Sequence, residues 1–184
     1  LAEPRAPIVG HTQDFNFQYV VHEVAETNQS RGCMGQLTHP VADPLGEALS
    51  FTGRSNTVSR QSEDLACYLL LRTEDNSLEF VSGAGTCYRE RNRDSSDGGI
   101  EVVGTNAIAQ TTLEFFNLIS VLSLEYWGYT GQWHIGIHVT NLADKLLSFN
   151  DLYLRGQTFP RDTFTNQAVT APATWSDGAE PQAR

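Results

Sequence analysis

The clearest pattern of hydrophobic and polar positions in this chain runs from Thr105 to Thr140. Over 106–127 the polar positions recur at helical spacing along one narrow line, and the positions between them are apolar or small. This pattern predicts one long, mostly buried helix with Thr105 as its N-cap. The polar line consists of Gln110, Glu114, Asn117 and Glu125.

Large apolar residues form two ridges along this predicted helix, and we expect both to be buried. One ridge is Ile108, Phe115, Ile119, Leu122 and Tyr126, and the other is Leu113, Phe116, Leu124 and Trp127. Gly128 and Gly131 should end the helix, because glycine reaches the left-handed conformation without steric cost. After them the period changes to two, which predicts a strand over 132–140 with Trp133 and Ile137 facing the helix and His134 facing away.

The remaining elements are less regular. Alternating apolar residues predict a strand over 14–25, and further strands are expected at 48–52, at 77–88 and at 99–104, with the last two forming a hairpin. Segment 62–73 has a serine cap and early acids, as helices do, although its leucine run would also suit a buried strand. We predict a helix there.

Together these elements predict an α+β fold in which an antiparallel or mixed sheet packs on one long, mostly buried helix. A chain of 184 residues is expected to form a single domain over 1–184. Residues 1–13 should be a loose lead-in, and a polar, proline-broken surface arm should begin at about residue 156.

Composition disfavours several classes of partner. Twelve basic residues face twenty-two acidic ones, a formal charge of −10, so we expect no membrane binding and no direct nucleic-acid binding by this chain alone. Cys33, Cys67 and Cys87 are too far apart in sequence for a disulfide framework or a zinc knuckle. No charged and apolar leader opens the chain, which predicts a cytoplasmic protein with reduced thiols.

The histidines of WHIGIH, His134 and His138, are the first candidates for chemistry. On a strand they lie on one face but about 13 Å apart, too far to ligate one metal ion. A groove for a small ligand, lined by His134, Gly136, His138 and His22, is the alternative that remains. We expect no metal and no cofactor.

The row Arg89, Arg91 and Arg93 is the candidate for contact with an acidic partner, although Glu90, Asp94 and Asp97 favour a solvated hairpin tip. The glycines of 83–85 lack the third glycine and the following helix of a dinucleotide site, so a strand bulge is the better interpretation. No local nucleophile and base motif occurs, and the sequence leans away from an enzyme.

Two segments, GRSNTVSRQSEDLACYLL and WGYTGQWHIGIHVTNLADKLLSFNDLYLRGQTFPRDTFTNQAVTAPATW, resemble a known family. They are similar to the carboxy-terminal portion of large actinobacterial proteins whose amino-terminal part is a DNA-binding domain of the AlbA (Schlafen-like) type. In that family the nucleic-acid role is assigned to the amino-terminal domain, so no functional residue is carried over. The resemblance implies a non-catalytic accessory module for ligand sensing, regulation or dimerisation, with a homodimer or protein partner. A small-molecule enzyme or sensor using the His134 and His138 face is the alternative.

Overall fold

Two β-sheets and two helices make up the part of the chain that the computed structural model describes, which is residues 1–8, 15–27, 34–53, 65–82, 87–90, 100–149 and 152–172. The strands are β1 (Ala2–Pro4), β2 (His39–Asp43), β3 (Gly46–Gly53), β4 (Leu65–Arg72), β5 (Leu78–Ser82), β6 (Cys87–Glu90), β7 (Ile100–Gly104), β8 (Trp133–Val139), β9 (Leu146–Phe149), β10 (Leu152–Thr158) and β11 (Phe164–Thr170). The helical elements are α1 (Phe17–Thr27), the 3₁₀ turn η1 (Met34–Gln36), α2 (Thr105–Val121) and the π-helical turn η2 (Leu122–Tyr126), which continues α2.

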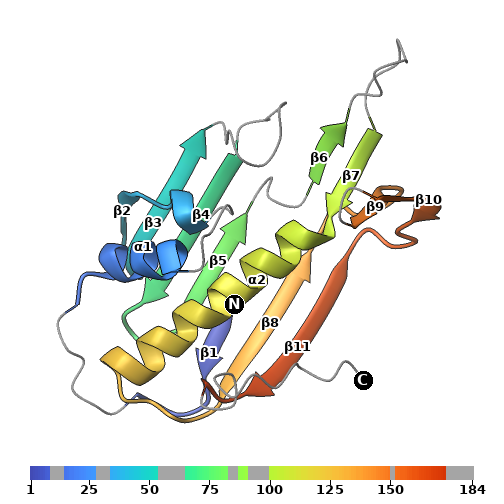
Figure 1. The fold of residues 1–184 in the computed structure, drawn as a ribbon. Helices are drawn as coiled ribbons and strands as arrows, with labels where there is room; N and C mark the ends of the chain where they lie inside the picture. The colour runs from blue at the N-terminus through green and yellow to red at the C-terminus, as the bar shows by residue number, and fades with distance from the viewer. Residues whose placement is uncertain are drawn as a thin grey trace.

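The large sheet has seven strands in the order β11-β8-β1-β5-β4-β3-β2, and every neighbouring pair is antiparallel. The small sheet has four strands in the order β10-β9-β7-β6, with a parallel pair between β7 and β9. Both helices lie on the same side of the large sheet, α1 over β3 and β4, and α2 across its middle (Figure 1). The opposite side of the large sheet carries no helix of the described chain, and we call it the open face.

The core lies between the helices and the large sheet. Leu118 and Leu122 on the α2 side meet this core together with Leu69 of β4, Leu78 of β5 and Trp133 of β8, all fully buried. Burying such side chains stabilises the fold by roughly 1.5–3 kcal/mol each. Along β8 the alternation is as predicted, since Trp133 and Ile135 are buried, Ile137 is half-buried, and the histidines between them are exposed.

The predicted fold class, one long and mostly buried helix packed on a sheet, is wrong. Most of the described residues in regular elements are strands, a second sheet is present, and a second helix shares the core. The long helix is also buried on one side only, because Leu113 and Leu124 of the second ridge are 59% and 39% exposed. The first ridge supplies the buried side, through Phe115, Ile119 and Leu122.

The polar line of the long helix faces solvent only in part. Glu114, expected at the solvent, is 1% exposed, whereas Glu125 is exposed as predicted. Gln110 and Asn117 are half-buried. The polar line therefore did not identify the solvent side of α2. The side that faces solvent carries Leu113 and Leu124 instead.

The strand predicted over 14–25 is a helix. One face of α1 is apolar and buried, and it consists of Phe17, Val20, Val21 and Val24. The side chain of Asn16 caps the helix, with its Oδ1 accepting the Tyr19 N–H at 3.1 Å. Aromatic residues at alternate positions had suggested a strand, but Tyr19, which belongs to that alternation, is 61% exposed.

The helix predicted over 62–73 is also wrong, because residues 65–72 form β4 in the interior of the large sheet. Cys67, Leu69 and Leu71 face the helices, and Leu70 on the other face is 3% exposed. An interior strand can be apolar on both faces, so its leucine run has no period of two. The alternative of a buried strand was the correct one.

Two segments expected to be loose are strands of the large sheet. Within the predicted lead-in, β1 pairs with both β5 and β8. Within the predicted surface arm, β11 pairs with β8 in an unbroken register from Phe164 with Val139 to Thr170 with Trp133. Residues 39–43, where no strand was expected, form the opposite edge strand β2.

Several predicted elements are confirmed: the helix over 106–127, the strands over 132–140 and 48–52, and the hairpin of β6 and β7. The strand expected over 77–88 is divided, because β5 belongs to the large sheet and β6 to the small one. Gly83, Ala84 and Gly85 lie outside the described residues. Gly128 has a φ of +59°, as expected where the helix ends.

Candidate interaction surface

The predicted ligand residues are not brought together. His134 and His138 are exposed on the open face, because the alternate residues of β8 point into the core. His22 lies on α1, on the other side of the large sheet, where its Nε2 is 3.0 Å from the Glu26 carboxylate. The sheet therefore separates His22 from the other two histidines.

Gly136 lies between the two histidines on β8. A Cβ at this position would meet no atom within 4 Å, so the close approach of a neighbour does not explain the glycine. A hollow of about 850 Å³ lies between the start of α1 and the β2–β3 hairpin, and none of the predicted ligand residues lines it. In the described part of the chain no three His, Cys, Asp or Glu side chains gather as metal ligands would.

Of the three arginines in the row, only Arg89 lies within the described residues. Arg89 lies on β6 opposite Glu101 of β7, and Arg91 and Arg93 lie outside the described residues. Of the cysteines, Cys67 is buried, and its thiol donates to the Ser82 Oγ at 3.7 Å. Cys67 packs in the core between the sheet and the helices, so it adds no reactive group to the open face.

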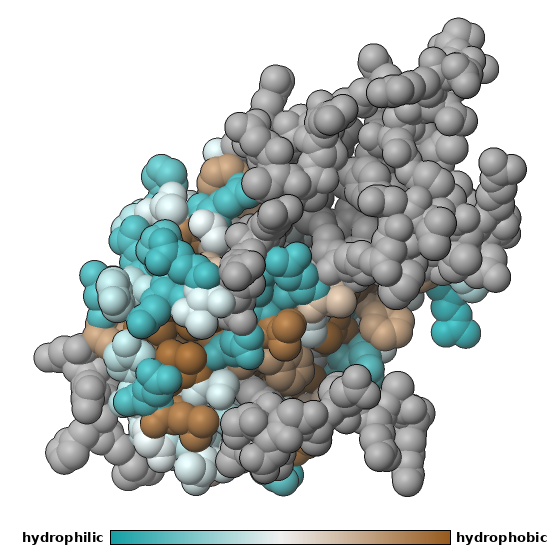
Figure 2. Space-filling model, in the orientation of Figure 1, coloured by the Kyte–Doolittle hydropathy of each residue, from teal (hydrophilic) through white to brown (hydrophobic). Residues whose placement is uncertain are grey.

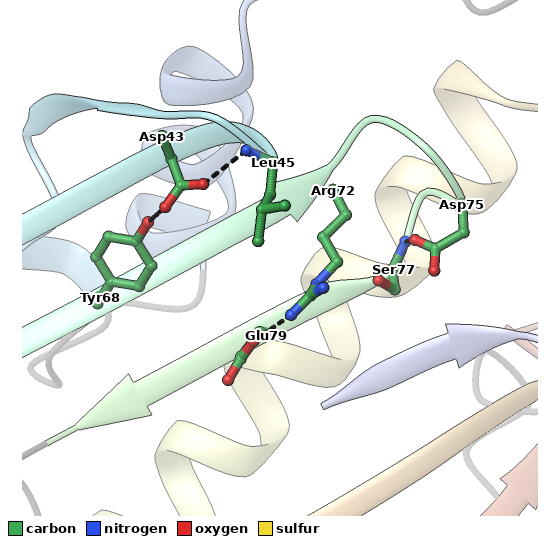
Figure 3. A network of polar contacts seen from close by, with 7 residues as sticks. All are labelled: Asp43, Leu45, Tyr68, Arg72, Asp75, Ser77 and Glu79. Atoms are coloured by element: carbon green, nitrogen blue, oxygen red, sulfur yellow. Dashed lines mark hydrogen bonds and ion pairs between the residues drawn. The ribbon is translucent and has the colours of Figure 1, made fainter.

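A polar cluster does occupy the open face over β2–β5 (Figure 3). The Tyr68 hydroxyl donates to the Asp43 carboxylate, whose Oδ1 also accepts the Leu45 N–H at 2.8 Å. Beside them, the Arg72 guanidinium pairs with Glu79 at 3.1 Å. The cluster joins the β2–β3 turn to β4, and β4 to β5.

Electrostatics assign this cluster a structural role. Partial burial and the hydrogen bond to Asp43 raise the pKa of Tyr68 to about 12. The hydrogen bonds from Tyr68 and then from Leu45 lower the pKa of Asp43. At neutral pH the phenol is therefore a fixed donor and the carboxylate a fixed acceptor, and neither is poised to exchange a proton. The Arg72–Glu79 pair is a surface ion pair, worth about 0–1 kcal/mol.

On the side that carries the helices, exposed apolar residues are scattered among polar ones (Figure 2). They include Tyr19 of α1 and Leu113 of α2, each more than half exposed. Single exposed apolar side chains are normal on a protein surface and indicate no binding site. The helix side is therefore a weaker candidate than the sheet itself.

The edge strand β11 is exposed along nearly its whole length. Every residue from Phe164 to Val169 is exposed, and Thr170 is half-buried. Phe164 and Val169 are 51% and 48% exposed, and the strand carries no charged side chain. An edge strand of this kind presents unpaired N–H and C=O groups to a partner.

The hydrogen bonds of Gly136 show which groups of β11 point outward. The Gly136 N–H donates to the Leu1 carbonyl at 2.8 Å, and the Gly136 carbonyl accepts from the Leu1 nitrogen at 3.1 Å. Gly136 therefore points toward β1, and its neighbours Ile135 and Ile137 point toward β11, since main-chain direction alternates along an antiparallel strand.

The register carries this alternation across to β11. Ala168 lies opposite Ile135, and Asn166 lies opposite Ile137, so these residues bond to β8. Thr165, Gln167 and Val169 must then direct their N–H and C=O groups to the open edge. The Gln167 N–H donates to the Asn166 Oδ1 at 2.9 Å, a local bond that a partner strand would replace. The 2.7 Å contact between His138 Nδ1 and Thr165 Oγ1 agrees with this, because side chains lie closest in pairs that share no main-chain hydrogen bond.

The other edge of the large sheet is different. Strand β2 contains Pro40, which has no N–H to donate, and Asp43, whose carboxylate is charged. Proline and charge are the usual protection of an edge strand against pairing. The two edges thus differ, and β11 is the unprotected one.

Comparisons with protein-family models, with curated proteins and with solved structures find no match for this chain. The resemblance to proteins with an AlbA-type domain therefore stays a prediction. Among the described residues, no helix is both long enough and apolar enough to span a lipid bilayer.

Proposed function

We propose that this chain is a non-catalytic interaction module that binds an extended partner strand along β11. The observation that carries the proposal is the open edge formed by Thr165, Gln167 and Val169, which is uncharged, free of proline and exposed. Adding a strand to such an edge satisfies its main-chain groups and extends the sheet.

Side chains beside the edge would give the binding its selectivity. On the open face a partner strand would lie next to Thr165, Gln167 and Val169, and on the helix side next to Phe164 and Ala168. An uncharged strand with small or apolar residues suits both rows. Cross-strand pairs of this kind each contribute roughly 0.2–1 kcal/mol.

A one-edged peptide tests the proposal. A capped peptide of the β11 sequence, N-methylated on alternate amides, can pair along one edge only and so cannot form fibrils. With the dilute full-length chain, we expect amide hydrogen exchange to slow at Thr165, Gln167 and Val169, and to stay unchanged at Asn166 and Ala168, which already bond to β8.

Two variants sharpen this experiment. Gln167→Pro removes an outward N–H and its local bond to the Asn166 side chain, but no bond to β8, so peptide binding should fall by at least about tenfold. Gln167→Thr keeps the N–H and should bind like the parent chain. Peptide binding that Gln167→Pro leaves unchanged, or no protection of the outward amides at saturating peptide, would show the proposal to be wrong.

A further inference from the structure

The geometry of β11 points to a specific partner, and this inference rests on the proposed function. We propose that the strand bound along β11 is β11 of a second copy of this chain, antiparallel, with a two-fold axis at Gln167. The contact is isologous, so each copy supplies the same strand to the other.

The alternation of the main chain selects this register. An axis at Gln167 places Gln167 opposite itself, and Thr165 opposite Val169 of the second copy. Each of these is a pair of outward-pointing residues, so every outward N–H and C=O of both strands forms a hydrogen bond across the axis, with the Gln167 N–H exchanging its bond to the Asn166 Oδ1 for one to the second copy. An axis at Asn166 or Ala168 would leave some of these groups unpaired.

Side chains are compatible with the same register. On the helix side, Phe164 lies opposite Thr170 and diagonal to Ala168 of the second copy, which covers an aromatic ring that is 51% exposed in the monomer. On the open face, the row His138, Thr165, Val169, His134 continues across the axis, so the histidines of the two copies do not meet.

Charge favours this contact over others between two copies. The chain carries a formal charge of −10, so most pairs of surfaces would bring carboxylates together. Residues 164–170 contain no ionisable side chain, and the register with β8 is continuous, whereas the β9–β10 pair is irregular. Two acidic copies can therefore approach along this neutral, regular strand with little repulsion.

The test uses the fact that residue 167 would meet itself. Sedimentation equilibrium of the full chain, from low to several hundred micromolar, should show a monomer–dimer equilibrium for the parent chain and for Gln167→Thr. Gln167→Pro should be monomeric. Gln167→Lys and Gln167→Glu should each dimerise at least about tenfold more weakly, because like charges then lie opposite each other.

Mixing the charged variants gives the sharpest result. An equimolar mixture of Gln167→Lys and Gln167→Glu should associate with near-parental affinity at low salt, since opposite charges now face each other at the axis. Matching thermal melts of all variants at dilute concentration would show that each is folded. No gain on mixing, or a dimer that Gln167→Pro leaves intact, would overturn the two-fold contact.

The outcomes also separate this inference from the proposed function. A parent chain that stays monomeric at every concentration, while the one-edged peptide still protects the outward amides, would exclude the second copy and keep the binding edge. Loss of both the peptide protection and the dimer would refute both proposals.

Discussion

Gly46, the first residue of β3, lies against the main-chain carbonyl of Leu71 in β4, so that a Cβ on Gly46 would overlap the Leu71 oxygen. Gly46 directly follows the Pro44–Leu45 turn and pairs with Arg72, the neighbour of Leu71. The obstacle is backbone in the interior of the sheet, which cannot move aside as a flexible side chain could. The glycine is therefore required by the close approach of two strands.

We expect Gly46→Ala to lower the free energy of unfolding by roughly 1–3 kcal/mol, as overpacking does. Gly136→Ala is the matched control, because it adds the same methyl group to the same sheet where no atom lies within 4 Å. It should leave stability unchanged or raise it by up to about 1 kcal/mol. Urea unfolding of both variants measures the difference, and equal effects would contradict the packing at Gly46.

Leu118→Ala should lower the free energy of unfolding by about 2–5 kcal/mol, because Leu118 is fully buried in α2. Leu113→Ala, which truncates the same side chain on the exposed side of the same helix, should change it by less than about 0.5 kcal/mol. Phe116 is half-buried, so Phe116→Ala should cost less than the roughly 3–5 kcal/mol lost when a fully buried phenylalanine is truncated. Denaturant melts that rank Leu113 above Leu118 would mean that the buried side of α2 is misplaced.

Tyr68→Phe should destabilise the fold at neutral pH, because it removes the donor to Asp43. The pKa of Tyr68 is raised from 10.0 to about 12, so this contribution is fully present below pH 10 and is lost as pH rises through about 12. The gap in unfolding free energy between the parent chain and Tyr68→Phe should therefore close over that range. A gap that stays constant to the alkaline limit would show that the hydroxyl is not the source.

The same hydrogen bond should also make the unfolding free energy depend on pH in the acid range. The pKa of Asp43 is lowered from 3.8, so its contribution is present above pH 3.8 and is lost as pH falls through the folded-state value. Asp43→Asn should flatten that part of the stability profile, which urea unfolding across acid pH would measure. If the variant loses unfolding free energy at acid pH as steeply as the parent chain does, other carboxylates and not Asp43 cause that loss.

Duplex DNA should not bind this chain alone at physiological salt. Nonspecific affinity comes mainly from lysines and arginines that displace counterions, and here twelve basic residues face twenty-two acidic ones. A fluorescence anisotropy titration at about 150 mM salt should stay flat into the tens of micromolar, with or without Arg91→Ala. Saturable binding below a micromolar that Arg91→Ala abolishes would make the arginine row a functional site.

The sequence predicted correctly those elements whose periodicity had one interpretation. The long helix and β8 each bury one side and expose another, so apolar spacing identified both. Helix α1 was missed because Phe15, Phe17 and Val21 fit an alternation while Phe17, Val21 and Val24 fit a helix. Its cap at Asn16 was the local signal that could have decided between them.

The candidate surface was beyond local patterns for a different reason. β11 buries almost nothing on either face, so its residues give no hydrophobic period, and only its threonines, Val169 and Phe164 hint at a strand. The place of β11 at an edge follows from its pairing with β8. The register of that pairing also decides which main-chain groups point outward, namely those of Gln167 and of the residues two positions away on either side. Both are set by tertiary pairing. His134 and His138 were correctly placed on one face, but His22 could not be excluded from it without the topology.

The short strand β1 also makes the large sheet divisible. β5 and β8 are not neighbours in the sheet, so among the described strands the meander β2–β5 and the pair of β8 and β11 are joined only through Ala2–Pro4. The meander consists of strands adjacent in sequence and can form through local contacts, whereas β1 must find partners more than seventy residues away at Leu78 and more than a hundred and thirty away at Ile135. The seam at β1 should therefore close late in folding and open first under load, so that the half carrying β11 behaves as a foldon of its own.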